Sequence, residues 1–346
     1  MGLDDQGLDG LLDGAFKEAA GGSVLERIEQ LHGAGSSVLL READEDVSPV
    51  LIRREDEALP EDDARYQILG ELARGGIGVV YRGRDKDLNR DIALKVLRPE
   101  YAEREDVVQR FVEEAQVAGQ LQHPGIVPVY GLGLQEDGRP SFAMKLIKGR
   151  TLAELLDSNP RGIDLIAVFE QVAQTMAYAH SRGVIHRDLK PANVMVGAFG
   201  EVQVVDWGFA KILGQDETQR APDRTVIATA RSGPIGSQSV DGSVMGTPAY
   251  MPPEQAMGRV DDLDERTDVF ALGAILCEVL TGRAPYIGEP RDQLIAAVQC
   301  LLEPAHERLD AADAPEGLKE IVRECLRPLS VERPRNARIV AERLAT

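Results

Sequence analysis

His186-Arg187-Asp188-Leu189-Lys190-Pro191-Ala192-Asn193 is the stretch that decides the fold. It lies between apolar residues and brings a carboxylate, an ammonium and an amide into one short loop. Asp188 can accept or orient the proton of an attacking hydroxyl, and Lys190 can offset charge on a transferring phosphoryl group. Asn193 can bind Mg²⁺, a hard cation that prefers oxygen ligands. The string therefore indicates phosphoryl transfer, and a merely charged surface loop is the weaker interpretation.

A second signal lies nearer the N-terminus. Arg74-Gly75-Gly76-Ile77-Gly78 is a Gly-rich segment, and Ile92-Ala93-Leu94-Lys95 follows it. Glycines let backbone N–H groups approach phosphate oxygens without a Cβ in the way. Alone, the first segment could be an ordinary hairpin turn and Lys95 a solvated strand lysine. Because the two segments follow one another in this order, together they indicate a site for the phosphates of a nucleotide.

These motifs, in this order, resemble the protein-kinase family, and specifically the Hanks-type Ser/Thr kinases of bacteria that are similar to the eukaryotic ones. The resemblance covers about Tyr66 to Leu344. Asp206-Trp207-Gly208 occupies the place of the family's D-F-G, and the segment from Gly246 to Glu254 resembles the one ending in A-P-E. Three positions depart from the family pattern: Ala73 for the first loop glycine, Trp207 for Phe, and Pro252 for Ala.

The resemblance implies a set of site residues. Catalysis would involve Asp188, Lys190, Lys95 and Glu114. Glu114 is preferred to Glu113 as the partner of Lys95 because the family places this glutamate directly before Ala. The metal ligands for Mg²⁺ would be Asn193 and Asp206. The ATP-binding residues would be Ala73, Arg74, Gly75, Gly76, Ile77, Gly78, Val80, Ala93, Lys95, Met144, Lys145, Ile147 and Met195.

Within that set, Val80 and Ala93 would cover one face of the adenine and Met195 the other. Met144 would be the gatekeeper, and the backbone from Lys145 to Ile147 would form the hinge.

Other residues would support the site. The resemblance implies a buried bridge between Glu254 and Arg333, and an Asp268 that braces the catalytic loop. Thr247 would open the substrate-facing segment. The remaining histidines suggest little chemistry: His123 and His180 are expected in packing or turns, and His32 and His306 at the surface.

Hydrophobic patterning predicts an α+β fold with two lobes, a small β-rich N-lobe at about 66–147 and a larger helical C-lobe at about 148–345. The strand-like runs are 66–73, 79–83, 91–97, 126–132 and 141–147, and the helical ones are about 103–121, 163–181, 267–281, 291–302, 316–326 and 336–344. Residues 1–65 hold 17 Asp and Glu against 6 Lys and Arg. They are expected to form an acidic extension, with a short helix capped by Ser23 and then a linker.

Composition limits the partners. The 346 residues carry a net charge of −19, which argues against nucleic acid or an anionic membrane as a ligand. The three cysteines are widely spaced and favour a reducing compartment. No apolar run approaches 18 residues, the length that a membrane span requires. We therefore expect a cytoplasmic chain without a membrane span.

The resemblance implies a protein Ser/Thr kinase that uses ATP and Mg²⁺ on Ser and Thr hydroxyls of proteins. One alternative is a pseudokinase scaffold that binds nucleotide without phosphotransfer, and a second is a small-molecule phosphotransferase of related fold. The segment from Gly214 to Gly246 is rich in Ser and Thr, and we expect autophosphorylation there by a transiently associated second copy, with Ser243 as the first candidate acceptor. In the family, Arg187 receives such a phosphate.

Overall fold

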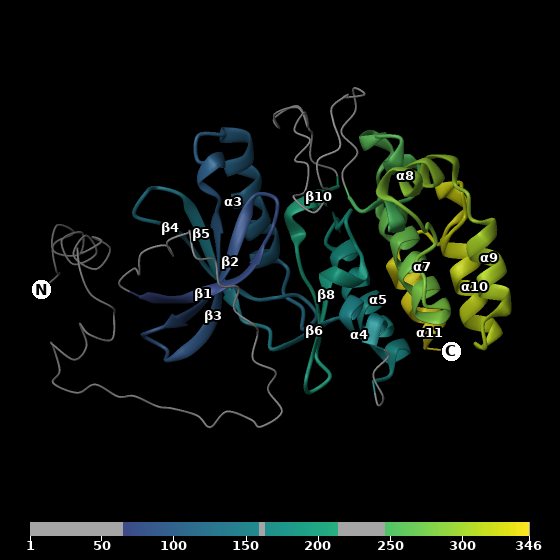
Figure 1. The fold of residues 1–346 in the computed structure, drawn as a ribbon, viewed down its shortest axis with the longest axis horizontal. Coiled ribbons are helices and arrows are strands. Elements are labelled where there is room, and N and C mark those ends of the chain that lie inside the picture. The colour runs from purple at the N-terminus through teal and green to yellow at the C-terminus, as the bar shows by residue number, and fades with distance from the viewer. Residues whose placement is uncertain (1–64, 159–162, 214–245, 346) are drawn as a thin grey trace, which may run out of the picture.

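The computed structural model describes residues 65–158, 163–213 and 246–345. Three expectations lie outside these residues: the helix capped by Ser23, the linker that follows it, and the phosphate acceptors between Gly214 and Gly246. For the described residues, the two lobes are present: a sheet and one long helix lie on one side, and the remaining helices, together with short strands, lie on the other (Figure 1).

The N-lobe is built on a five-stranded antiparallel sheet in the order β1-β2-β3-β5-β4. Its strands are β1 (Tyr66–Arg74), β2 (Gly78–Asp85), β3 (Arg90–Leu97), β4 (Val129–Leu134) and β5 (Pro140–Lys145). Alternation along β3 divides its side chains between the two faces. Ile92, Leu94 and Val96 join one buried cluster, so Ala93 and Lys95 face the other side.

Helix α3 (Glu105–Gln120) covers part of that second face. Phe111 on α3 packs against Phe142 on β5, with ring centroids 5.2 Å apart, and Phe142 lies directly opposite Lys95 in the sheet. The apolar packing therefore sets the distance between α3 and the strand that carries Lys95.

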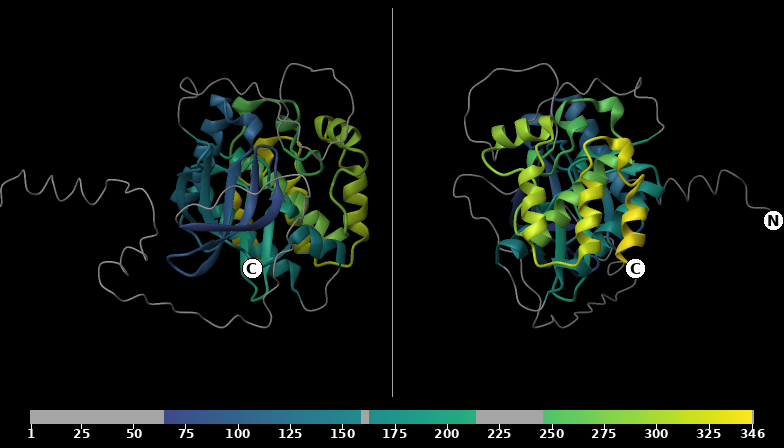
Figure 2. Two further views of the ribbon diagram at one scale, coloured as in Figure 1. Left: turned by 60° about the vertical axis from the view of Figure 1, so that its left-hand side comes forward. Right: turned by 90° about the vertical axis from the view of Figure 1, so that its right-hand side faces the viewer.

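The C-lobe is organised around α7 (Glu265–Thr281), which is buried from Thr267 to Cys277. Asp264 caps its N-terminus by accepting from the Arg266 N–H, and Gly282 ends it in the left-handed region. The surrounding helices are α4 (Leu152–Ser158), α5 (Leu165–Ser181), α6 (Pro253–Ala256), α8 (Pro290–Gln299), α9 (Glu303–Ala311), α10 (Glu316–Cys325) and α11 (Ala337–Leu344). The turned views show α9, α10 and α11 on the side away from the sheet (Figure 2).

Short strands carry the site residues of the C-lobe. They are β6 (Gly149–Thr151), β7 (Val184–Ile185), β8 (Val194–Gly197), β9 (Val202–Val204) and β10 (Lys211–Ile212). Two 3₁₀ turns lie at these positions: η2 (Pro191–Asn193) forms the end of the segment from His186 to Asn193, and η3 (Trp207–Phe209) directly follows Asp206.

Three sequence expectations were wrong in detail. The fourth strand begins at Val129, because Ile126 makes only an isolated bridge to Val204. Helix α9 was not predicted, since its only buried residues are Ala305 and Leu309 and such a pattern is too weak to recognise. His306 lies half-buried on this helix and not at the surface.

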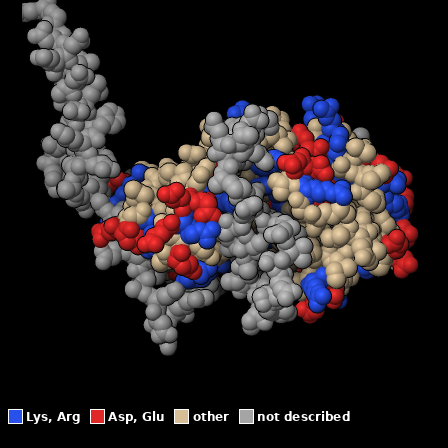
Figure 3. All heavy atoms as spheres, turned by 90° about the horizontal axis from the view of Figure 1, so that it is seen from above, with Lys and Arg blue, Asp and Glu red and all other residues tan. Residues whose placement is uncertain are grey.

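On the face drawn in Figure 3, acidic and basic side chains of the described residues are interspersed. Among the described residues, none of the helices combines the length and the apolar character that crossing a membrane requires. The thiols of Cys277, Cys300 and Cys325 are all free.

Candidate active site

Lys95 forms an ion pair with Glu114. Its Nζ lies 2.5 Å from Glu114 Oε1 and 3.9 Å from Asp206 Oδ1. One residue of slip on a helix turns a side chain by about 100°, and Glu113 accordingly bonds Gln109 instead. Burial alone would lower the pKa of the Lys95 ammonium, but the charges of Glu114 and Asp206 outweigh burial and raise it. Lys95 is therefore a cation held between two carboxylates.

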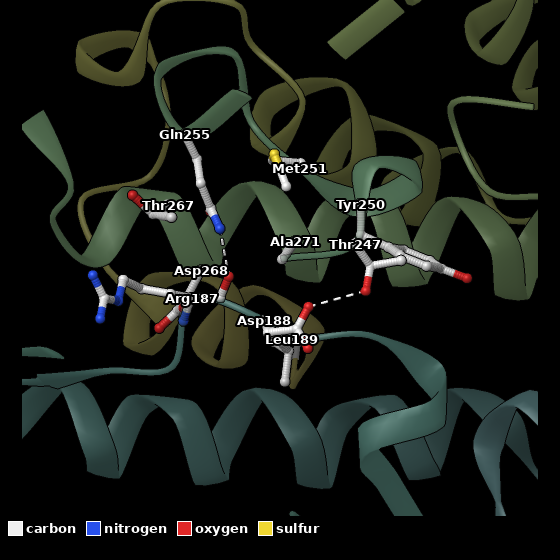
Figure 4. Close-up of a pocket in the computed structure, with 10 residues that line it drawn as sticks. All are labelled: Arg187, Asp188, Leu189, Thr247, Tyr250, Met251, Gln255, Thr267, Asp268 and Ala271. Carbon is white, nitrogen blue, oxygen red and sulfur yellow. Dashed lines mark hydrogen bonds between the residues drawn. The ribbon is translucent and has the colours of Figure 1, made fainter. Parts of the chain in front are cut away.

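Asp188, Lys190 and Thr247 form a closed triangle of hydrogen bonds. Lys190 Nζ donates to Asp188 Oδ2 at 2.7 Å and to Thr247 Oγ1 at 2.7 Å, and the Thr247 hydroxyl donates to Asp188 Oδ1 at 3.0 Å. Figure 4 shows Thr247 and Asp188 facing each other at a small pocket and joined by this hydrogen bond, with Tyr250 beside Thr247. Both carboxylate oxygens are thus held in place, and the segment that begins at Thr247 is attached to the loop that carries Asp188.

Asp268 braces the catalytic loop, as expected. It is fully buried, and its carboxylate accepts from the backbone N–H groups of His186 at 2.8 Å and Arg187 at 2.9 Å. These bonds hold Arg187 in the left-handed region, at φ 66°. Burial would raise the pKa of Asp268, but bonding to His180 and the neighbouring His186 outweighs burial and lowers it.

His180 has a structural role that the sequence did not indicate. Its Nε2 lies 3.0 Å from Asp268 Oδ2, and its Nδ1 accepts from the Ala337 N–H at 3.1 Å. His180 therefore links Asp268 to the start of α11. Because the contacts come from residues far along the chain, no local signal could have identified them.

Asn193 and Asp206 offer oxygen atoms suited to a hard cation. The Asn193 amide nitrogen donates to Asp188 O at 2.8 Å, and among the described residues no donor bonds its Oδ1. Asp206 has φ 64°, and its side chain is 45% exposed. A side chain at Gly208 would fit tightly, because its Cβ would lie 3.0 Å from Glu114 Oε2 and 3.4 Å from Asp206 Oδ1. Carboxylate and amide oxygens are ligands that Mg²⁺ accepts.

Trp207 fills the position beside these ligands. It is 3% exposed, its ring centroid lies 4.8 Å from that of His186, and its Nε1 donates to Val204 O at 3.2 Å. Trp207 is therefore a buried, well-packed side chain whose only polar side-chain atom is hydrogen-bonded.

The predicted adenine-side residues lie on matching faces of the sheet. Val80 is opposite Lys95 and Ala93 is opposite Met144, so all four share the face that carries the ammonium. Ala93 is buried, whereas Val80 and Met144 are partly exposed. Met195 lies on β8 in the C-lobe and is also partly exposed.

One backbone donor of the predicted hinge is already engaged. The Lys145 N–H donates to Pro128 O at 3.0 Å. The N–H donors that the predicted hinge could offer a ligand would therefore be those of Leu146 and Ile147.

The Gly-rich loop closes on itself between β1 and β2. The Gly75 N–H donates to Gly78 O at 2.8 Å. Arg74 turns toward Glu71, with Nη2 2.8 Å from Oε2, and Ala73 is exposed. The Gly75 N–H is therefore already bonded within the loop, and the Arg74 side chain is directed to Glu71.

The bridge between Glu254 and Arg333 is confirmed. Arg333 Nη1 and Nη2 donate to the two Glu254 oxygens at 2.6 and 2.9 Å, and the Arg333 side chain is fully buried. This pair joins the end of the substrate-facing segment to the C-terminal helices.

Comparison with known proteins agrees with this geometry. The model of the protein kinase domain family matches residues 66–344. The chain is 34% identical over 250 residues to the serine/threonine-protein kinase PknD of Protochlamydia amoebophila, covering 68% of this chain and 25% of the relative. It is 38% and 36% identical over 238 residues to the proteins of that name from Chlamydia muridarum and Chlamydia trachomatis serovar D, covering 64% of this chain and 25% of each relative.

The chain spans about a quarter of the length of these relatives. The family match nevertheless covers both lobes and every site residue described above. The chain therefore belongs to the protein kinase domain family.

Proposed function

We propose that this chain is an ATP- and Mg²⁺-dependent protein serine/threonine kinase. The observation that carries the proposal is the triangle of Asp188, Lys190 and Thr247. It holds a carboxylate ready to receive a hydroxyl proton and places an ammonium beside it. The Lys95–Glu114 pair lies on the facing lobe, where the phosphates of ATP would enter.

In this mechanism Asp188 orients the Ser or Thr hydroxyl of the substrate and takes its proton as the new O–P bond forms. The bond between the γ-phosphorus and the bridging oxygen of ADP breaks, and ADP leaves. Lys190 offsets negative charge on the transferring group, and Lys95 holds the α- and β-phosphates. Glu114 keeps Lys95 in position.

Mg²⁺, when bound, supplies positive charge to the phosphate oxygens, and Asn193 and Asp206 are the residues that would hold it. Asn193 also donates to the backbone of Asp188. Asp188, which would receive the proton, and Asn193, which would hold the metal, are therefore fixed relative to each other.

The further assignments are part of the same proposal. Residues 66–345 form the catalytic domain, and residues 1–65 form an acidic extension to it. A second copy of the chain is the expected source of phosphate on the segment from Gly214 to Gly246. Free thiols at Cys277 and Cys325 favour a reducing, cytoplasmic setting.

The test is to incubate the purified chain with γ-labelled ATP and Mg²⁺, with and without a generic Ser- and Thr-containing protein, and to map the labelled residues. Label on Ser or Thr that disappears in Asp188→Asn supports the proposal. Nucleotide binding without any transfer would instead identify a pseudokinase scaffold. Transfer to small hydroxyl compounds alone would identify a small-molecule phosphotransferase.

A further inference from the structure

Arg98 contacts the tip of the Gly-rich loop from outside the site described above. It is the first residue after β3. Its Nη1 donates to Gly76 O at 3.1 Å and lies 3.5 Å from Gly75 O, and its backbone N–H donates to Ile77 O at 2.9 Å. Three successive carbonyls of the loop therefore point toward one residue.

This arrangement determines where the loop N–H groups point. In a planar trans peptide the C=O and the N–H of the next residue point in opposite directions. With the carbonyls of residues 75–77 turned toward Arg98, the N–H groups of Gly76, Ile77 and Gly78 are turned away from it. Within the described part of the chain, no acceptor bonds the Gly76 or Ile77 N–H. Backbone N–H groups of a turn that have no acceptor in the protein can bind an anion.

Arg98 is itself held in place. Its guanidinium pairs with Glu100, lies 5.8 Å from the centroid of the Tyr101 ring, and is 19% exposed. Ile77 and Tyr101 pack against the same apolar cluster, which is built on Phe111. The loop tip therefore rests on the connection between β3 and α3 through both polar and apolar contacts.

We propose that Arg98 is a positioning residue that presets the loop amides for the phosphates of a nucleoside triphosphate. This inference rests on the proposed function, because it assumes that the loop binds ATP. Arg98 acts through the loop backbone and not by contact with the adenine. Its loss is expected to weaken binding of nucleotides with phosphates and to leave binding of adenosine unchanged.

The experiment compares wild type, Arg98→Gln and Arg104→Gln by calorimetry with Mg²⁺-ATP and with adenosine. Arg104 is the matched control, because it lies in the same connection and its exposed guanidinium pairs with Asp106. We expect Arg98→Gln to weaken ATP binding by about tenfold, equivalent to about 1.4 kcal/mol. Adenosine affinity in Arg98→Gln, and both affinities in Arg104→Gln, should stay within twofold of wild type.

Three results would overturn the inference. ATP affinity within twofold of wild type in Arg98→Gln would show that the contact does not set the loop. Equal weakening of ATP and adenosine would show a general structural effect of Arg98 on the N-lobe. If the wild-type chain binds ATP no more tightly than adenosine, both the inference and ATP as the substrate are refuted. If only the inference fails, the wild-type chain still binds ATP more tightly than adenosine.

Discussion

Replacing Arg333 by Lys should destabilise the fold by about 4 kcal/mol while leaving the chemistry of the site in place. Arg333 makes five hydrogen bonds from a fully buried guanidinium. Two go to Glu254, and the others go to the carbonyls of Arg327, Arg266 and Pro328 at 2.7, 3.2 and 3.0 Å. A lysine ammonium has three donors on one atom. At least two buried acceptors would lose their partner, at about 1–3 kcal/mol each.

The assay is urea unfolding followed by circular dichroism and by the fluorescence of Trp207, which is the only tryptophan. A loss of this size corresponds to a fall in Tm of about 10 °C for a domain of this length. Phosphotransfer per folded molecule, measured well below the Tm, should stay near the wild-type value, since Arg333 touches none of the proposed catalytic residues.

Arg338→Lys is the matched control. Arg338 pairs with Glu342 one helical turn away, and the two side chains are 77% and 61% exposed. An exposed pair of this kind contributes about 0.5 kcal/mol or less. The free energy of unfolding of Arg338→Lys should lie within about 1 kcal/mol of the wild-type value. If that of Arg333→Lys does so too, the number of buried hydrogen bonds does not determine stability here and the reasoning is wrong.

Three other predictions concern the site. Lys95→Met should abolish phosphotransfer in a labelled-ATP assay, and it should also lower the Tm by a few degrees because Glu114 loses its buried partner; near-normal turnover would exclude Lys95 from catalysis. Asp206→Ala should remove Mg²⁺-dependent nucleotide binding in calorimetry, whereas Asp188→Asn should bind ATP almost normally and lose about 10² or more in turnover; equal binding by both variants would contradict this division of roles. The pKa of Asp268 is lowered in the folded state, so its contribution to stability is complete above the unfolded value of about 3.9 and is lost as the pH falls through the folded value. In acid titrations, the Asp268→Asn variant should therefore lose less stability than wild type as the pH falls below about 4. The same acid dependence in both proteins would count against this assignment.

Much of the N-lobe could be predicted because strand periodicity is a local property. The alternation around Lys95 places it on one face, and that face is where β2 and β5 present Val80 and Met144. The choice of Glu114 over Glu113 rested on the resemblance to the family, and the structure places the Glu114 carboxylate on Lys95.

The C-lobe was harder to predict in detail. Strands of two or three residues, such as β7 and β10, are too short to show a period. Helix α9 buries only one pair of residues, and the sequence around it is polar. The contacts of Arg98 with the loop tip were also missed, because an arginine after a strand is usually a solvated residue.

The sequence by itself determined which chemical groups the chain carries and in what order. Asp188, Lys190 and Asn193 lie in one loop, and the resemblance of that loop to the protein-kinase family implies phosphoryl transfer. Periodicity in the chain determined the strands and the long helices, since burial of one face follows from the repeat of each element.

Only the tertiary structure decided how these groups meet. Thr247 reaches Asp188 across 59 residues, and Asp268 reaches the His186 backbone across 82. Such contacts depend on the packing of α7 against α5 and the catalytic loop, and no local pattern encodes that packing. The same holds for the peptide orientation in the Gly-rich loop, because glycine permits many backbone angles, and contacts such as those of Arg98 and the Gly75–Gly78 bond select one of them.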